Sequence, residues 1–205
     1  RRGVFSVFFA FVLTKGIVVA GVHADPYASA VASAKAQVVE GRKLREKNDH
    51  AGARDKFKAA FALLATPAVG LDLGKEHLAL KELVEARTVF LAIASLPGSE
   101  KDSGESKAAR QEAGRLAADL EPRIPTLVVK IAGAPPGTTS RLTIDGEEIP
   151  EAALSMARIL DPGSHTVVVN AGMATEKRIE VELKEGEARQ LLVQLDKIET
   201  PVTPP

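Results

Sequence analysis

At residues 121–125 the sequence reads Glu-Pro-Arg-Ile-Pro, and the spacing of apolar residues differs on the two sides of this stretch. Before Pro122, apolar residues recur at the period of an amphipathic helix. After Ile124 they alternate with polar residues, which is the period of a half-buried strand. Because proline interrupts a helix and favours an extended residue before it, the two prolines mark a boundary. The sequence therefore predicts an α+β protein of two domains, over residues 25–122 and 123–197.

The helical half contains an internal repeat. Two amphipathic stripes are visible, one formed by Ala53, Phe57, Ala60, Phe61 and Leu64 and the other by Ala79, Leu83, Ala86, Phe90 and Ile93. Gly41, Ala53, Phe57 and Ala60 are matched 33 residues later by Gly74, Ala86, Phe90 and Ile93. A fixed period of this size indicates stacked helix pairs, here two pairs capped by a further helix over residues 105–121. The alternative is chance similarity within an alanine-rich helical region.

The second half has the pattern of a small antiparallel β domain. Apolar residues alternate in several short runs, and Arg178, Glu180 and Glu182 place charge on the opposite face of one run. Asp145-Gly146 suits a type I′ hairpin, and the stretch 184–187 joins two long strands. Five to seven strands within about 75 residues predict an immunoglobulin-like sandwich.

The first residues have the organisation of an export signal. Two arginines precede an apolar stretch over residues 3–22, and small residues close it at Ala24. This order predicts a signal peptide over residues 1–24 and a periplasmic or envelope location. The alternative is an uncleaved membrane anchor, which Lys15 within the apolar stretch makes costly. The last residues, 198–205, are rich in proline and predict an extended tail.

Composition excludes several classes of protein. The chain has no cysteine, which excludes disulfide scaffolds, thiolate metal sites, cysteine nucleophiles and a lipid attached to cysteine. Its 27 basic and 27 acidic residues balance, so no global attraction to nucleic acid is expected. Residues 1–24 hold three basic residues and no acidic one, so the remainder is mildly acidic. With seven Phe, one Tyr and no Trp, aromatic platforms for sugars or bases are scarce.

No residue set predicts catalysis. His50, His77 and His165 are scattered, and His77 with Glu76 and Glu82 is interpreted as a solvated helix face rather than a metal site. The glycine-rich stretches lack the spacing or the backbone N–H groups of a phosphate loop. We therefore expect no enzyme activity, no cofactor, no metal and no small-molecule substrate.

Two resemblances follow from these residues. The glycine and the small–aromatic–small series of the helical half resemble the tetratricopeptide repeat. The order Ile144-Asp145-Gly146-Glu147, then Asp161-Pro162-Gly163-Ser164 leading into an alternating strand, resembles the PEGA domain. Together with the export signal, the combination is similar to envelope proteins of myxobacteria-like bacteria. The resemblance implies an extracytoplasmic, non-enzymatic module for contacts with a protein or a surface.

The tetratricopeptide resemblance also implies a binding groove. In such stacks the inner face of each first helix receives an extended peptide, and here that face would comprise Lys35, Val38, Arg42, Arg45, Leu71, Lys75 and Leu78. Residues 41–58 hold seven basic and three acidic residues, which favours an acidic peptide or carboxylate partner. A solvated face is the alternative for each residue.

These observations predict an exported interaction scaffold that binds an envelope protein or peptide through the helical repeats. The alternative is a cell-wall or carbohydrate-binding module that acts through the β-sandwich loops around Pro135 and Pro162. The scarcity of aromatic residues argues against that alternative.

Overall fold

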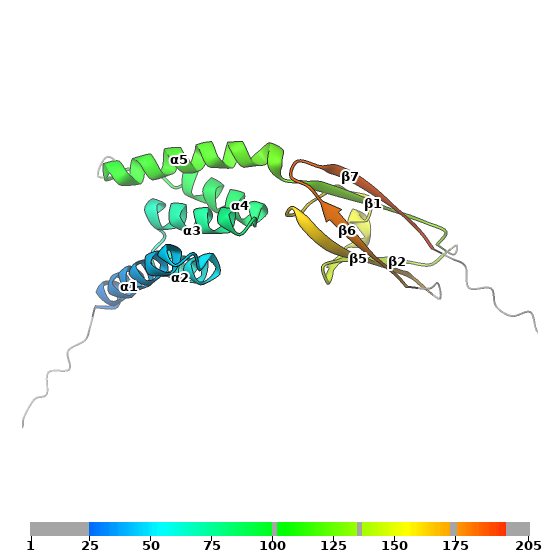
Figure 1. The fold of residues 1–205 in the computed structure, drawn as a ribbon, viewed down its shortest axis with the longest axis horizontal. Coiled ribbons are helices and arrows are strands. Elements are labelled where there is room, and N and C mark those ends of the chain that lie inside the picture. Colours follow the sequence, from blue (N-terminus) through cyan, green and yellow to red (C-terminus); the bar gives the residue numbers. More distant parts are fainter. Residues whose placement is uncertain (1–24, 100–101, 135–136, 173–175, 196–205) are drawn as a thin grey trace, which may run out of the picture.

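The computed structural model of the 205-residue chain describes residues 25–99, 102–134, 137–172 and 176–195. The helices are α1 (Pro26–Glu46), α2 (His50–Leu63), α3 (Pro67–Ala79), α4 (Leu83–Ala94) and α5 (Gly104–Leu120), with short 3-10 turns η1 (Glu121–Arg123) and η2 (Glu151–Ala153). The strands are β1 (Thr126–Ala132), β2 (Ser140–Ile144), β3 (Glu147–Ile149), β4 (Arg158–Ile159), β5 (Gly163–Ala171), β6 (Lys177–Leu183) and β7 (Ala188–Gln194). Helices and strands form two parts that lie end to end (Figure 1). The predicted α+β order is confirmed.

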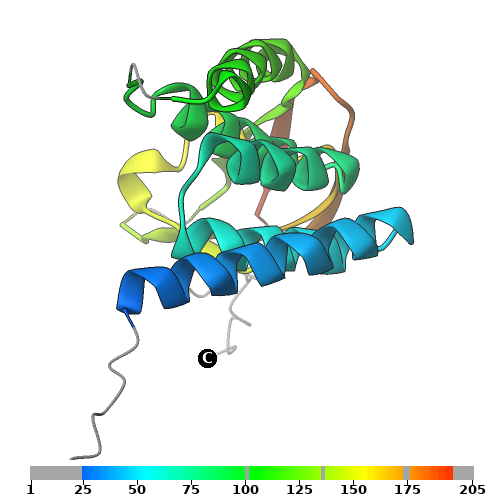
Figure 2. The same cartoon turned by 90° about the vertical axis from the view of Figure 1, so that its left-hand side faces the viewer.

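The helices stack in sequence order, and α3 is the enclosed one. Each helix contacts the next along the chain, and α3 also contacts α5. Figure 2 shows the stack from its end, with α1 and α5 on opposite sides and α3 and α4 between them. A residue on α3 therefore meets other helices on more sides than a residue on α1 does.

The two helix hairpins are closed by similar turns. Asn48, between α1 and α2, has φ 60°, and Lys81, between α3 and α4, has φ 63°. Residues other than glycine rarely adopt this left-handed conformation. After the first turn, Asp49 caps α2 by accepting a hydrogen bond of 2.9 Å from the N–H of Gly52. The two left-handed residues lie 33 positions apart, as the sequence repeat does.

Each hairpin also closes around a phenylalanine ring that lies on a glycine. A Cβ atom added to Gly41 would lie 3.0 Å from the Phe57 ring, and one added to Gly74 would overlap the Phe90 ring. Both rings are fully buried. Because glycine has no side chain, the ring occupies the space that a Cβ atom would need. The predicted buried stripe is confirmed at Ala53, Phe57, Ala60, Ala86, Phe90 and Ile93, all 0% exposed.

The strands form two sheets that share one core. The strand orders are β4-β1-β7 and β3-β2-β5-β6. The core between them consists mainly of alternating residues from both sheets, including Leu127, Val129, Leu142, Val167, Val181 and Val193. On β6 the charged side chains of Arg178, Glu180 and Glu182 are exposed, as the alternation predicts. One face of each long strand is therefore buried and the other is solvated.

The prediction of a wholly antiparallel β domain is wrong at one pair of strands. β1 and β7 run parallel, with Leu127 opposite Arg189 and Ile131 opposite Val193. The turn over residues 184–187 does not form a hairpin, because β6 and β7 belong to different sheets. The chain crosses between the sheets at this turn, so the neighbour of β7 is β1.

The β2–β3 hairpin confirms the turn type predicted from Asp145-Gly146. Both residues have positive φ, 53° for Asp145 and 85° for Gly146, as a type I′ turn requires. No atom lies within 4 Å of a Cβ atom added to Gly146, so only backbone strain opposes a side chain there.

Replacing Gly146 with alanine is expected to lower the free energy of unfolding by about 1 kcal/mol, because alanine resists positive φ. Urea denaturation followed by circular dichroism measures this change. Gly104→Ala is the matched control. Gly104 is the first residue of helix α5, and a Cβ atom added there would also have no atom within 4 Å. Equal losses in the two variants would contradict a cost specific to the turn.

Several predictions fall outside the described residues. These are the signal peptide over residues 1–24, the tail over residues 198–205 and the proline pair at 135–136. Among the helices that the structure describes, none has the length and hydropathy needed to cross a bilayer.

Candidate functional site

The seven residues of the predicted groove lie on two helices, α1 and α3. Lys35 and Lys75 are exposed. Val38 packs against the core around Phe57, while Leu71 and Leu78 pack against the core around Phe90. The structure thus brings the two helices together, but the three apolar members of the set contribute to helix packing.

The two arginines of the predicted groove are bound to carboxylates on α3. Arg45 pairs with Asp72 at 2.9 Å and with Glu76, and its guanidinium lies 4.7 Å from the centre of the Phe57 ring. Arg42 lies 3.7 Å from Asp72 and remains more than half exposed. Burial opposes ionisation of Arg45, but Glu76 and Asp72 outweigh it and raise the pKa of Arg45. The charge of the two arginines is therefore largely balanced by carboxylates within the protein.

The interpretation of Glu76, His77 and Glu82 as a solvated helix face is wrong. Glu76 is only 2% exposed and His77 only 8%. The carboxylate of Glu76 contacts Nδ1 of His50 at 2.8 Å as well as Arg45. His77 Nδ1 lies 2.5 Å from the Glu82 carboxylate. These side chains are buried because α3 is enclosed by neighbouring helices, which the sequence of α3 alone does not reveal.

The charged side chains around α3 connect three helices. Glu82 also accepts from Arg54 of α2 at 2.6 Å. Within the described ranges, no group of three or more His, Asp or Glu side chains is arranged to hold a metal ion. The network therefore ties α1 and α2 to α3 and to the α3–α4 turn.

An apolar pocket lies between α2 and α4, with α3 at its floor. Its volume is about 500 Å³. The apolar part of the lining consists of Phe61, Ala62, Leu73, Val84 and Val89, and the polar part of Lys58, His77, Glu85 and Thr88. We call this set of residues the α2–α4 pocket.

Sequence reasoning missed this pocket because it assigned binding to the first helix of each pair. The lining also comes from three different helices, so no single helix segment of the sequence shows it. Apolar pockets with a few polar groups at the edge are the usual form of ligand and peptide sites. The α2–α4 pocket is therefore a candidate site in the helical region.

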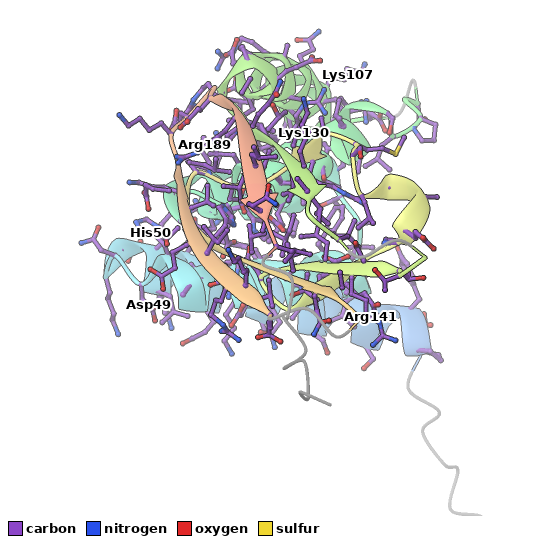
Figure 3. All side chains as sticks on the ribbon, turned by 90° about the vertical axis from the view of Figure 1, so that its right-hand side faces the viewer. Asp49, His50, Lys107, Lys130, Arg141 and Arg189 are labelled. Atoms are coloured by element: carbon purple, nitrogen blue, oxygen red, sulfur yellow. The ribbon has the colours of Figure 1, made fainter. Side chains whose placement is uncertain are left out.

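A second, more polar cavity lies on the β2–β5 side of the sandwich. Its volume is about 580 Å³, and its lining consists of Thr138, Thr139, Arg141, Thr143, Val168, Asn170, Gly172 and Glu176. Figure 3 shows Arg141 on the face of β2 that is turned away from β1 and β7. Hydroxyl, amide and guanidinium groups can donate several hydrogen bonds to a polar ligand. We call this the sheet-face cavity.

No model of a known protein family matches the chain, and no curated protein matches it. The candidate sites therefore rest on the geometry of this chain.

Proposed function

We propose that this protein is an exported, non-enzymatic scaffold of the bacterial envelope, which binds a protein or peptide partner through tetratricopeptide-like helix pairs joined to a PEGA-like β-sandwich. Two features support the repeat. The left-handed turn residues Asn48 and Lys81 lie 33 positions apart, and so do the two glycine–phenylalanine contacts. Stacked helix pairs of this kind present extended surfaces, which suit the binding of a partner rather than catalysis.

The observation that carries this function is the α2–α4 pocket. Its apolar lining is bordered by the exposed cation Lys58 and by Glu85, which interacts with Asp161 of the β region, whereas Arg42 and Arg45 on the α1–α3 face are already paired with Asp72. A partner segment with one apolar anchor side chain and a neighbouring carboxylate matches this arrangement. The anchor would fill the pocket, and the carboxylate would pair with Lys58.

Selection from a displayed library of random peptides on the full protein tests the chemistry of the partner. We expect the selected peptides to share a leucine, methionine or phenylalanine followed or preceded by an acidic residue. The apolar residue supplies the anchor, and the acidic residue pairs with Lys58. Selection should be repeated on a Lys58→Glu variant, in which the preference should change from acidic to basic neighbours.

Two results would contradict this site. One is a set of selected peptides without an apolar anchor. The other is an unchanged charge preference in Lys58→Glu, since Lys58 is the exposed cation on which that preference depends.

Export is the part of the proposal that a mass measurement tests. Intact mass of the protein recovered from the periplasmic fraction should correspond to a chain that begins at Asp25. Recovery of the uncleaved chain in the membrane fraction would instead support an anchor over residues 3–22.

The sheet-face cavity favours a second candidate, binding of a cell-wall polysaccharide. Three threonine hydroxyls, the Asn170 amide and the Arg141 guanidinium border one hollow, which suits a polyhydroxylated ligand. Co-sedimentation of the full protein with peptidoglycan tests it. The paired variant Arg141→Ala with Asn170→Ala should then remain in the supernatant, and equal pelleting of this variant would reject the cavity as the site.

A further inference from the structure

Helix α4 is capped by the β region rather than by its own sequence. Glu82 occupies the N-cap position, but it makes no capping hydrogen bond, because its carboxylate is bound to His77 and Arg54. Instead the carboxylate of Asp161 accepts a hydrogen bond of 2.9 Å from the N–H of Val84. Asp161 lies between β4 and β5, 77 residues further along the chain. In Figure 1 the start of β5 lies next to the helical part.

His165, near the start of β5, holds Asp161 in place from the other side. Its Nε2 lies 2.7 Å from the carbonyl oxygen of Asp161, and its Nδ1 lies 2.7 Å from a carboxylate oxygen of Asp145. Both partners are acceptors, so both ring nitrogens must carry a proton to satisfy them. Only the imidazolium form can therefore make both hydrogen bonds.

The surrounding charges also favour the protonated form of His165. Burial of the ring lowers the pKa of His165, but Asp145 and Asp161 outweigh burial and raise it above 6.5. Burial also raises the pKa of Asp161, and the neighbouring Glu85 of α4 raises it further, against the N–H groups of Leu83 and Val84.

Other charged groups at the junction are paired with each other. Glu185, before β7, pairs with Arg123 at 2.8 Å and is also attracted by Lys81 of the α3–α4 turn. Arg87 of α4 lies 3.3 Å from Glu121. The Arg123–Glu185 pair stays charged from mildly acidic to mildly basic pH, because Glu185 raises the pKa of Arg123 and Arg123 lowers the pKa of Glu185.

We propose that Asp161, Glu85, His165 and Asp145 form a proton-dependent clasp, which fixes the helical region against the β region at mildly acidic pH and loosens as the pH rises. Protonated His165 orients Asp161, and Asp161 caps α4. The orientation of the two regions, and hence the spacing between the candidate sites, is thereby linked to pH.

For both titrating groups, His165 and Asp161, the stabilisation of the clasp decreases as the pH rises. The stabilisation from His165 is present below its unfolded pKa of about 6.5 and is lost as the pH rises through the higher folded value. Asp161 behaves likewise at lower pH, because burial and the neighbouring Glu85 raise its folded pKa. The clasp is therefore stronger at mildly acidic than at mildly basic pH.

Distance measurements between two spin labels on the full protein test the clasp. The chain has no cysteine, so Ala51→Cys on α2 and Glu147→Cys on β3 give one label in each region, both at exposed positions. We expect a narrow distance distribution near pH 5.5 and one about twofold broader near pH 8.5. An unchanged distribution between the two pH values would overturn the proposal.

Variants of Asp161 and His165 separate the cap from the titration. Asp161→Ala removes the cap and should give the broad distribution at both pH values, whereas Asp161→Asn retains an oxygen acceptor and should stay narrow near pH 5.5. His165→Gln cannot become charged and should remove most of the difference between the two pH values. Asp161→Ala and Asp161→Asn giving the same distribution near pH 5.5 would overturn the role of the cap.

Discussion

Replacing Phe90 with alanine is expected to lower the free energy of unfolding by about 3 to 5 kcal/mol. The ring is fully buried and lies directly on Gly74, which has no side chain to move into the vacated space. The substitution therefore leaves a cavity between α3 and α4 as well as removing apolar contacts. Urea denaturation followed by circular dichroism measures the loss.

Two companion substitutions make this test specific. Phe57→Ala should cost a similar amount, because Phe57 lies on Gly41 in the same way. Leu91→Ala should cost under about 1 kcal/mol, because Leu91 is nearly half exposed. A loss in Phe90→Ala as small as that in Leu91→Ala would contradict the ring-on-glycine contact.

Replacing Glu76 with glutamine is expected to lower the free energy of unfolding by about 2 to 3 kcal/mol. Its carboxylate is almost wholly buried and binds both Arg45 and His50, so the neutral amide leaves a half-buried guanidinium with less negative charge near it. Arg45 and His50 keep about a third of their side-chain surface exposed, so the loss is smaller than for a fully buried pair. Thermal and urea denaturation measure it.

An exposed ion pair provides the control for Glu76. Asp119 pairs with Arg115 on α5 at 2.8 Å, and both side chains are more than half exposed. Asp119→Asn should therefore change the free energy of unfolding by no more than about 0.5 kcal/mol. Similar effects of the two substitutions would show that burial of Glu76 does not strengthen its interactions.

The features that the sequence predicts correctly depend on local pattern. The change from helical to alternating period places the strands after the helices, and the buried stripe around Phe57 and Phe90 follows from helical spacing. The type I′ hairpin at Asp145-Gly146 follows from two residues that tolerate positive φ. Each of these signals is contained within a short segment of chain.

The features that the sequence does not predict depend on contacts between distant segments. Glu76 and His77 look like a solvated face until α2 and α5 are packed on α3. The parallel pairing of β1 with β7 and the capping of α4 by Asp161 join residues far apart in the chain. The α2–α4 pocket exists only once two hairpins stack, so no single helix shows it.

The affinity of a selected peptide for matched variants is the most direct test of partner binding at the α2–α4 pocket. Thr88→Arg places a bulky cation in the pocket and should raise the Kd by about tenfold or more. Two control variants lie outside the pocket. The paired variant Lys35→Glu with Lys75→Glu reverses charge on the predicted α1–α3 groove, and Gln111→Arg adds charge at an exposed position of α5. Each control should leave the Kd within about twofold. Loss of affinity in the Lys35 and Lys75 variant, with Thr88→Arg unchanged, would contradict the pocket and assign binding to the α1–α3 face.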